Sequence, residues 1–201
     1  MASIFNIAKH SKKPAEGEEA GTFGTWDQSP AFKQVDFDSR TMSMSEITVP
    51  TGETASLTYW SNHLVDGGYP IMLCGLAGTG KTQIVNGLLH DLNGATYLHQ
   101  VINMNFYTSG TALQAILETA LQKQTATRFG PPPGTKMVYF IDDLNLPLVD
   151  PYNTQSAISL MRQHCDYEHW YDMTKLTLKD ICNCQYVSCM NPTAGSFLID
   201  P

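Results

Sequence analysis

Basic residues are scarce in this sequence. Its 201 residues include 12 Lys and Arg against 19 Asp and Glu, which gives a formal net charge of −7. Proteins that bind nucleic acid or an anionic membrane surface need a basic patch, and the densest basic cluster here, Lys9 to Lys13, has the character of a solvated tail. We therefore expect neither nucleic acid nor a membrane as a partner.

Long apolar runs and paired cysteine motifs are also missing. No stretch approaches the ~20 apolar residues of a membrane-spanning helix, and residues 1–6 turn polar at once, unlike a secretory signal peptide. The five cysteines are an odd number, and Cys182-Asn183-Cys184 lacks the spacing and the partner pair of a zinc site. These absences favour a soluble intracellular protein with free thiols in a reducing compartment.

One stretch carries a specific functional motif. Residues 70–82, PIMLCGLAGTGKT, run from an apolar segment into a glycine-rich turn that matches G-x-x-x-x-G-K-[ST]. Glycine permits a positive φ and lets backbone N–H groups approach phosphate oxygens where a side chain would collide. The motif predicts a strand, a phosphate-binding loop and a helix, with a nucleotide-binding set of Gly75, Leu76, Ala77, Gly78, Thr79, Gly80, Lys81 and Thr82.

The residues that close this motif predict how the phosphates are held. Lys81 is a point charge suited to the β- and γ-phosphates, where it serves both binding and catalysis, and the hydroxyl of Thr82 is suited to Mg²⁺. A helix that begins at Lys81 directs its unpaired first-turn N–H groups and the positive end of its dipole to the same phosphates.

Two further apolar segments end in polar residues. KMVYFI precedes Asp142 and Asp143, and QYVSCM precedes Asn191. Buried parallel strands have this pattern where their carboxyl ends open onto a ligand crevice. We expect Asp142, about 60 residues after Lys81, to hold Mg²⁺. Asp143 is expected to orient or deprotonate the attacking water, and the Asn191 amide to bond that water or the γ-phosphate. The predicted ligand is ATP or ADP with Mg²⁺.

Strand and helix patterns alternate along residues 45–201, which predicts a three-layer α/β/α domain with a parallel sheet. Residues 1–44 are expected to form an irregular N-terminal segment. The remaining elements predicted for the core are a strand over 96–106, a helix from Ala112 to about Lys123, a loop over 128–135, a helix over 154–163 and a hairpin insertion over 167–179.

Several segments together resemble one protein family. GLAGTGKT, FIDDLNLP, RQHCDYEHWYD and LTLKDICNCQYVSCMNPTAGSF are similar to the third AAA+ module in the motor ring of axonemal dynein heavy chains. VPTGET and the tail that carries Trp26 are similar to the segment that leads into that module. The first motif alone indicates only a phosphate-loop NTPase; the combination is far more specific, and it spans most of the chain.

The resemblance implies the large subdomain of an AAA+ P-loop NTPase that binds ATP and contributes to ATP-dependent, microtubule-based movement. By the same resemblance, the backbone of Val49, Pro50 and Thr51 lines the adenine, and Asn191 is the sensor-I residue. The implied partners are neighbouring AAA+ modules of the heavy chain, the microtubule through the rest of the motor, and other dynein subunits. The implied locations are the cytoplasm, the cytoskeleton and the axoneme of a cilium or flagellum.

The sequence departs from the family pattern in two respects. Strongly hydrolytic AAA+ modules carry glutamate where this chain has Asp143, and the shorter carboxylate predicts slow hydrolysis with a regulatory role. In the family, an arginine finger, a last core strand and a helical lid follow the position of Pro201, so the resemblance implies a core truncated at its C-terminus. Two alternatives stay open: a non-hydrolysing structural or regulatory nucleotide-binding module, and an AAA+ ring ATPase of the chaperone or remodelling kind.

Overall fold

The structure is a computed structural model of the 201-residue chain and describes residues 7–9, 23–28, 32 and 49–194. The chain falls into two compact units, residues 1–63 and 64–201. The domain boundary predicted near residue 44 lies outside the described residues and stays a prediction.

The first unit contains a small hairpin and most of a helix. Strand β1 (Ile7–Lys9) pairs antiparallel with β2 (Phe23–Thr25), and a short 3-10 helix, η2 (Trp26–Gln28), follows. Trp26 is buried, and its ring centroid lies 5.2 Å from that of Tyr59 in α1 (Gly52–Asp66). This contact gives Trp26 a packing role within its own unit.

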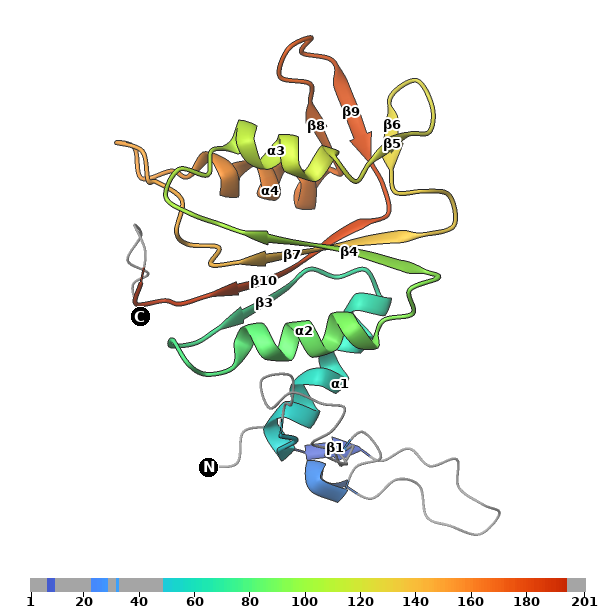
Figure 1. The fold of residues 1–201 in the computed structure, drawn as a ribbon, viewed down its shortest axis with the longest axis vertical. Coiled ribbons are helices and arrows are strands. Elements are labelled where there is room, and N and C mark those ends of the chain that lie inside the picture. Colours follow the sequence, from blue (N-terminus) through green and yellow to red (C-terminus); the bar gives the residue numbers. More distant parts are fainter. Residues whose placement is uncertain (1–6, 10–22, 29–31, 33–48, 195–201) are drawn as a thin grey trace, which may run out of the picture. The chain divides into compact units, whose positions relative to one another are not determined.

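The second unit is built on a parallel sheet. Its strands are β3 (Ile71–Cys74), β4 (Tyr97–Asn103), β7 (Lys136–Asp142) and β10 (Cys184–Met190). They lie in the order β3-β10-β7-β4, and all three pairings are parallel (Figure 1). The parallel α/β fold predicted from the sequence is confirmed.

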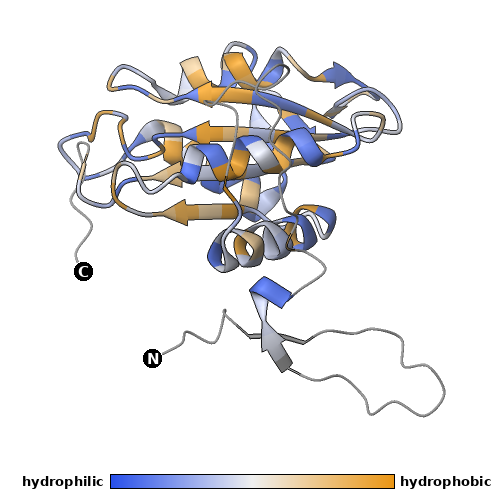
Figure 2. Cartoon of the chain, turned by 60° about the horizontal axis from the view of Figure 1, so that its bottom comes forward, coloured by the Kyte–Doolittle hydropathy of each residue, from blue (hydrophilic) through white to orange (hydrophobic). Residues whose placement is uncertain are grey.

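Helices cover both faces of this sheet. Helix α2 (Lys81–Asp91) lies on one face, and α3 (Gly110–Glu118) and α4 (Ser156–Tyr167) lie on the other (Figure 1). Hydrophobic stretches occur in the strands of the sheet (Figure 2), and all inner residues of β7 and β10 are buried, as expected for strands that are covered on both sides.

Strand β7 divides the core because its side chains alternate between the two faces. Its two even-numbered apolar residues, Val138 and Phe140, pack in one cluster with Val85, Leu88 and Leu89 of α2. Its odd-numbered apolar residues pack in the other cluster with side chains of α3 and α4; the members from these three elements are Met137, Tyr139, Ile141, Leu113, Leu117, Ala157 and Met161. The strand that ends in the predicted metal ligand is therefore fixed from both sides.

A second, smaller sheet corrects two sequence predictions. It has the order β5-β6-β9-β8, with strands β5 (Gln122–Lys123), β6 (Arg128–Gly130), β8 (His169–Tyr171) and β9 (Leu178–Ile181). The hairpin predicted over 167–179 is present as β8 and β9. The helix predicted to reach Lys123 ends at Glu118, because Lys123 pairs with Phe129 in β5-β6; and the stretch predicted as a loop contains β6, because Phe129 pairs with Ile181.

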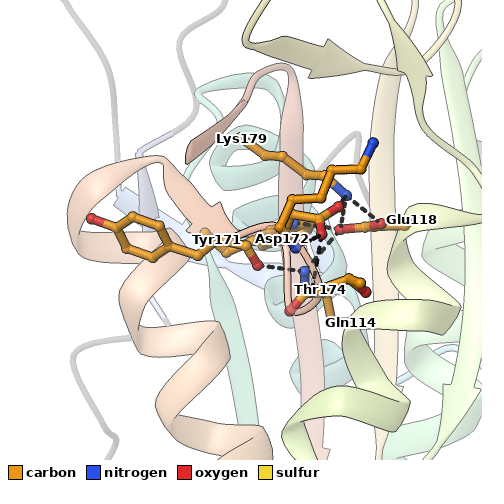
Figure 3. Close-up of polar contacts among 8 residues, drawn as sticks. Gln114, Glu118, Tyr171, Asp172, Thr174 and Lys179 are labelled. Carbon is orange, nitrogen blue, oxygen red and sulfur yellow. Dashed lines mark hydrogen bonds and ion pairs between the residues drawn. The ribbon is translucent and has the colours of Figure 1, made fainter. Parts of the chain in front are cut away.

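An ion network ties the hairpin of β8 and β9 to the end of α3 (Figure 3). The Nζ atom of Lys179 lies 2.9 Å from a carboxylate oxygen of Glu118 and 2.9 Å from one of Asp172, and only 14% of its side chain is exposed. Glu118 also accepts hydrogen bonds from Trp170 Nε1 and Gln114 Nε2, each at 2.9 Å. The partly buried ammonium group is thus paired with two carboxylates that are themselves hydrogen-bonded.

The network lowers the pKa of both carboxyl groups. Burial opposes ionisation of Glu118, but the hydrogen bonds from Gln114, Lys179 and Trp170 outweigh it, so the pKa of Glu118 is below its usual value. The hydrogen bond from Lys179 is the largest cause of the lowered pKa of Asp172, followed by the backbone N–H groups at the hairpin turn. Both groups therefore favour the folded state as carboxylates.

Gly110 provides a test of the packing between α3 and α4. A Cβ atom at Gly110 would lie 2.9 Å from the carbonyl oxygen of Ser156, a backbone atom that cannot rotate away. We expect Gly110→Ala to lower the free energy of unfolding by about 1–3 kcal/mol, the usual cost of overpacking, as measured by urea denaturation. Gly87 in α2 has open space at its Cβ position, so Gly87→Ala should raise that free energy by up to about 1 kcal/mol. Equal effects of the two substitutions would contradict the packing argument.

Lys179 provides a test of the ion network through pH. The pKa values of Glu118 and Asp172 are lowered in the folded state, so their contribution is present above the unfolded-state value of about 4 and is lost as the pH falls below it. Lys179→Met should therefore shift the urea midpoint downward most at pH 7 and progressively less as the pH falls from about 4 through the lowered folded-state pKa values of the two carboxyl groups. Lys175→Met, on the exposed turn of the same hairpin, serves as the control. A deficit for Lys179→Met that does not change with pH would refute the electrostatic explanation.

Candidate functional site: a phosphate loop facing two strand ends

The predicted phosphate loop connects β3 to α2. Gly78 and Gly80 have φ angles of +79° and +81°, in the left-handed region where a side chain is unfavourable. A Cβ atom at Gly75 would lie only 3.1 Å from Thr79 Oγ1. The glycines therefore provide the backbone turn that a phosphate cradle requires.

The first turn of α2 has the properties of an anion site. Gly80 is the N-cap residue and has no side chain to accept hydrogen bonds from the first N–H groups of the helix. The Nζ atom of Lys81 donates to the carbonyl oxygens of Gly75 and Leu76, at 2.8 Å each. The ammonium group is thus held over the loop, within reach of an anion that the loop would bind.

Thr82 and Asp142 meet although they are 60 residues apart in the sequence. Thr82 Oγ1 donates to Asp142 Oδ2 at 3.0 Å, because β7 ends beside the start of α2. A hydroxyl and a carboxylate are hard oxygen ligands of the kind Mg²⁺ prefers. In the described part of the chain, no group of three or more His, Cys, Asp or Glu residues is arranged to hold a metal. The pair therefore fits an ion that takes its other ligands from phosphate and water.

Asp143 has an unusual backbone conformation. Its φ is +54°, a region that Asp and Asn tolerate better than most residues. Its N–H donates to Asp142 Oδ1 at 3.0 Å, and its carbonyl accepts from the N–H of Leu146 at 3.0 Å. Asp143 is exposed and begins the turn after β7. Its predicted contact with water stays a prediction.

Asn191 follows β10 and lies next to the start of the phosphate loop. The N–H of Gly75 donates to the carbonyl oxygen of Met190 at 3.2 Å. The side-chain oxygen of Asn191 accepts hydrogen bonds from the N–H and hydroxyl of Thr193, at 3.1 and 2.9 Å. The structure thus places Asn191 at the same edge as Asp142; its bond to a γ-phosphate stays a prediction.

Asn145 is a site residue that the sequence pattern does not reveal, because LNLP after the two aspartates indicates only a turn. Its side chain is buried, and Nδ2 donates to the carbonyl oxygen of Asn191 at 2.8 Å and to that of Ala194. The sequence signal for Asn145 is its place in FIDDLNLP. That place indicates a turn residue and does not predict a contact with a backbone segment far along the chain.

The predicted adenine contacts belong to the other unit. Val49, Pro50 and Thr51 lie in residues 1–63, and the phosphate loop lies in residues 64–201. Thr51 precedes α1 and caps it reciprocally with Thr54, since Thr51 N donates to Thr54 Oγ1 at 2.8 Å and Thr54 N donates to Thr51 Oγ1 at 3.2 Å. The role of these residues in adenine binding stays a prediction.

Fold and site together define a class of protein. A parallel α/β sheet, a glycine loop leading from a strand into a helix, and a strand-end aspartate bonded to the loop threonine are the parts of a P-loop NTPase. No helix among the described residues is long and apolar enough to cross a membrane.

The comparisons specify the family. Residues 37–201 match the family of the P-loop containing dynein motor region, and the chain belongs to this family. It is 43% identical over 205 residues to dynein axonemal heavy chain 17 of Mus musculus; this match covers 98% of this chain and 4% of that relative. It is 48% identical over 168 residues to the dynein alpha chain, flagellar outer arm, of Chlamydomonas reinhardtii; this match covers 83% of this chain and 4% of the relative.

These findings confirm the resemblance to axonemal dynein heavy chains. The chain spans about 4% of the length of these curated relatives, so the activity of a whole heavy chain is a matter of proposal. Membership of a P-loop family implies nucleotide binding. The assignment to the third module of the ring stays a prediction.

Proposed function

We propose that this chain is an ATP-binding AAA+ module of an axonemal dynein heavy chain, the third module of its motor ring. The observation that carries the proposal is the hydrogen bond between Thr82 and Asp142, which joins the start of α2 to the end of β7 in a chain of the dynein motor family. Residues 45–201 form the AAA+ core in this proposal, and residues 1–44 lead into it.

The residues present have distinct roles in holding Mg·ATP. The loop N–H groups from Gly75 to Gly80 and the Lys81 ammonium bind the phosphates, for which Lys81 exchanges its carbonyl partners for phosphate oxygens. Thr82 and Asp142 hold Mg²⁺, which when bound neutralises charge on the β- and γ-phosphates. The backbone of Val49, Pro50 and Thr51 lines the adenine.

Hydrolysis at this module is slow and regulatory in our proposal. Asp143 orients the attacking water and Asn191 contacts that water or the γ-phosphate, but the aspartate side chain is one methylene shorter than glutamate. The nucleotide state of such a module gates the main motor site rather than driving the stroke. A non-hydrolysing regulatory module is the second candidate, favoured by the same short carboxylate. A chaperone or remodelling ATPase is less supported, because the matching relatives are named as dynein chains.

The proposed partners follow from the relatives. The module would contact neighbouring AAA+ modules of the same heavy chain, act on the microtubule through the rest of the motor, and work with other dynein subunits. The proposed location is the cytoskeleton of the cytoplasm, in the axoneme of a cilium or flagellum, and the proposed process is ATP-dependent movement along microtubules.

Lys81 tests nucleotide binding. In the heavy chain that contains this segment, Lys81→Ala should reduce nucleotide occupancy of the module at least tenfold, because a phosphate then loses a charge-assisted contact of about 1.5–3 kcal/mol. Photo-crosslinking with azido-ATP and isolation of the labelled peptide measures occupancy, and microtubule release should change with it. Lys123→Ala removes an exposed lysine of β5 as the control. Unchanged occupancy in Lys81→Ala would defeat the assignment.

Asp143 tests hydrolysis and separates the two candidate functions. If the short carboxylate limits the rate, Asp143→Glu should speed cleavage of bound ATP about tenfold, and Asp143→Asn should slow it by about 10²-fold or more. Asn tolerates the positive φ of this position as well as Asp does, so the second variant changes charge with little backbone strain. Single-turnover cleavage at this module is the measurement. Identical rates in all three forms would favour the non-hydrolysing module.

A further inference from the structure

A buried amide links the two polar strand ends of the site. Asn145 lies in the turn after β7, and 6% of it is exposed. Its Nδ2 donates to the backbone carbonyl of Asn191 at 2.8 Å and to that of Ala194. One planar side chain therefore joins the turn that begins with Asp143 to the segment that carries Asn191.

The orientation of this amide is fixed by its neighbours. Rotation by 180° would place Oδ1 against the same two carbonyl oxygens and lose both hydrogen bonds. In the observed orientation Oδ1 is buried without a hydrogen-bond partner in the described part of the chain. An unpaired buried acceptor costs about 1–3 kcal/mol. The two hydrogen bonds donated by Nδ2 offset this cost, and they explain why an amide occupies this position.

The turn around Asn145 is also held by other bonds. The N–H of Leu144 donates to the carbonyl oxygen of Cys189 at 3.0 Å, and Gln155 Nε2 donates to the carbonyl oxygen of Pro147 at 2.6 Å. The turn is thus a fixed body against which Asn145 holds the segment after β10. The backbone of Asn191 cannot move relative to this turn without losing a bond to Asn145.

We propose that Asn145 is a positioning residue for ATP hydrolysis at this module. By holding the carbonyl groups of Asn191 and Ala194, it sets the separation between the Asn191 amide and the Asp143 carboxylate, the two groups that the proposed function places on the attacking water. The inference rests on that proposed function. It predicts that loss of the Asn145 donors slows cleavage while nucleotide binding by the loop and Lys81 persists.

Gln185 provides a matched control within the same strand pair. It is also 6% exposed, its Nε2 donates to the carbonyl oxygen of Val65 at 3.1 Å, and its Oε1 is buried without a partner in the described part of the chain. Gln185 lies near the start of β10, whereas Asn191 follows the end of that strand. Gln185→Glu therefore disturbs a similar buried amide at the edge of the sheet away from the phosphate loop.

The experiment uses the heavy chain that contains this segment and azido-ATP labelled on either the α- or the γ-phosphate. After photo-crosslinking at successive times, the α-label on the peptide of this module counts all bound nucleotide, and the γ-label counts uncleaved ATP. Asn145→Asp keeps the shape of the side chain and removes both donors. We expect its α-label to stay within about twofold of wild type and its γ-label to disappear about 10- to 100-fold more slowly. Gln185→Glu should show wild-type kinetics.

The pH profile adds a readout that a general loss of stability would not give. A buried carboxyl facing two carbonyl oxygens has a raised pKa, and on protonation it regains one O–H donor. The cleavage rate of Asn145→Asp relative to wild type should therefore rise as the pH falls from about 8 to about 6. Asn145→Ser, which keeps one short donor, should be slowed less than Asn145→Asp at pH 8.

Several results would overturn the positioning role. These are wild-type cleavage in Asn145→Asp, parallel loss of α-label and cleavage, equal slowing in Gln185→Glu, or a wild-type module that binds ATP without cleaving it. Failure of both Asn145 variants to fold, where Gln185→Glu folds, would show a structural role instead. Absence of α-label from the wild-type module would remove the proposed function itself, which distinguishes the two failures.

Discussion

Parallel pairing of β10 between β3 and β7 is the constraint on which the site depends. Met190 is paired with Cys74, and Ser188 with Ile141. The residues that follow these strand ends therefore emerge at one edge of the sheet. The phosphate loop, the aspartate pair and Asn191 come from three distant parts of the sequence, and this register brings them together without any local connection.

The core explains why this edge is a firm base for chemistry. Val138, Tyr139 and Phe140 of β7 are all 0% exposed, with side chains packed on both faces of the sheet. Close packing on two sides leaves such a strand little freedom to shift. Asp142 ends β7 and is therefore held in place by the packing of that strand. Its hydrogen bond with Thr82 joins the strand end to α2. A site on rigid elements keeps its geometry before the ligand arrives.

The sequence allowed the large sheet to be predicted because each central strand carries its own signal. The apolar run before Asp142 and the run before the glycine loop are readable without knowledge of their partners. In the small sheet, the hairpin of β8 and β9 could be predicted, but β5 and β6 carry no such signal. Strand β6 is three residues long and pairs in parallel with β9, so Arg128 lies opposite Asp180. Short strands whose pairing is remote have too little local pattern to be distinguished from a loop. For the same reason the apolar pattern of α3 predicts a helix that runs past Glu118.

The site shows the same division between local and remote information. Thr82 and Asp142 could be predicted because a motif fixes one and a strand end fixes the other. Asn145 could not, because its function depends on backbone carbonyls that lie 46 and 49 residues further along the chain. Turn residues of this type are common for reasons of backbone conformation alone. Only the folded chain shows that its amide faces inward.

The energetics of Asn145 indicate geometry rather than stability as its main contribution. Two neutral hydrogen bonds contribute about 1 kcal/mol each, and an unpaired buried oxygen costs about 1–3 kcal/mol, so the sum is close to zero. An apolar side chain would not improve it, because the backbone carbonyl groups of Asn191 and Ala194 would each lose the donor from Asn145, and that of Asn191 would keep only the N–H of Ala194, at 3.3 Å. A planar amide offers two donors on one atom at a fixed angle, which serine or threonine does not. An amide suits this position because its two donors hold the backbone after β10. The unpaired Oδ1 atom is present because an amide carries an oxygen beside the nitrogen that donates.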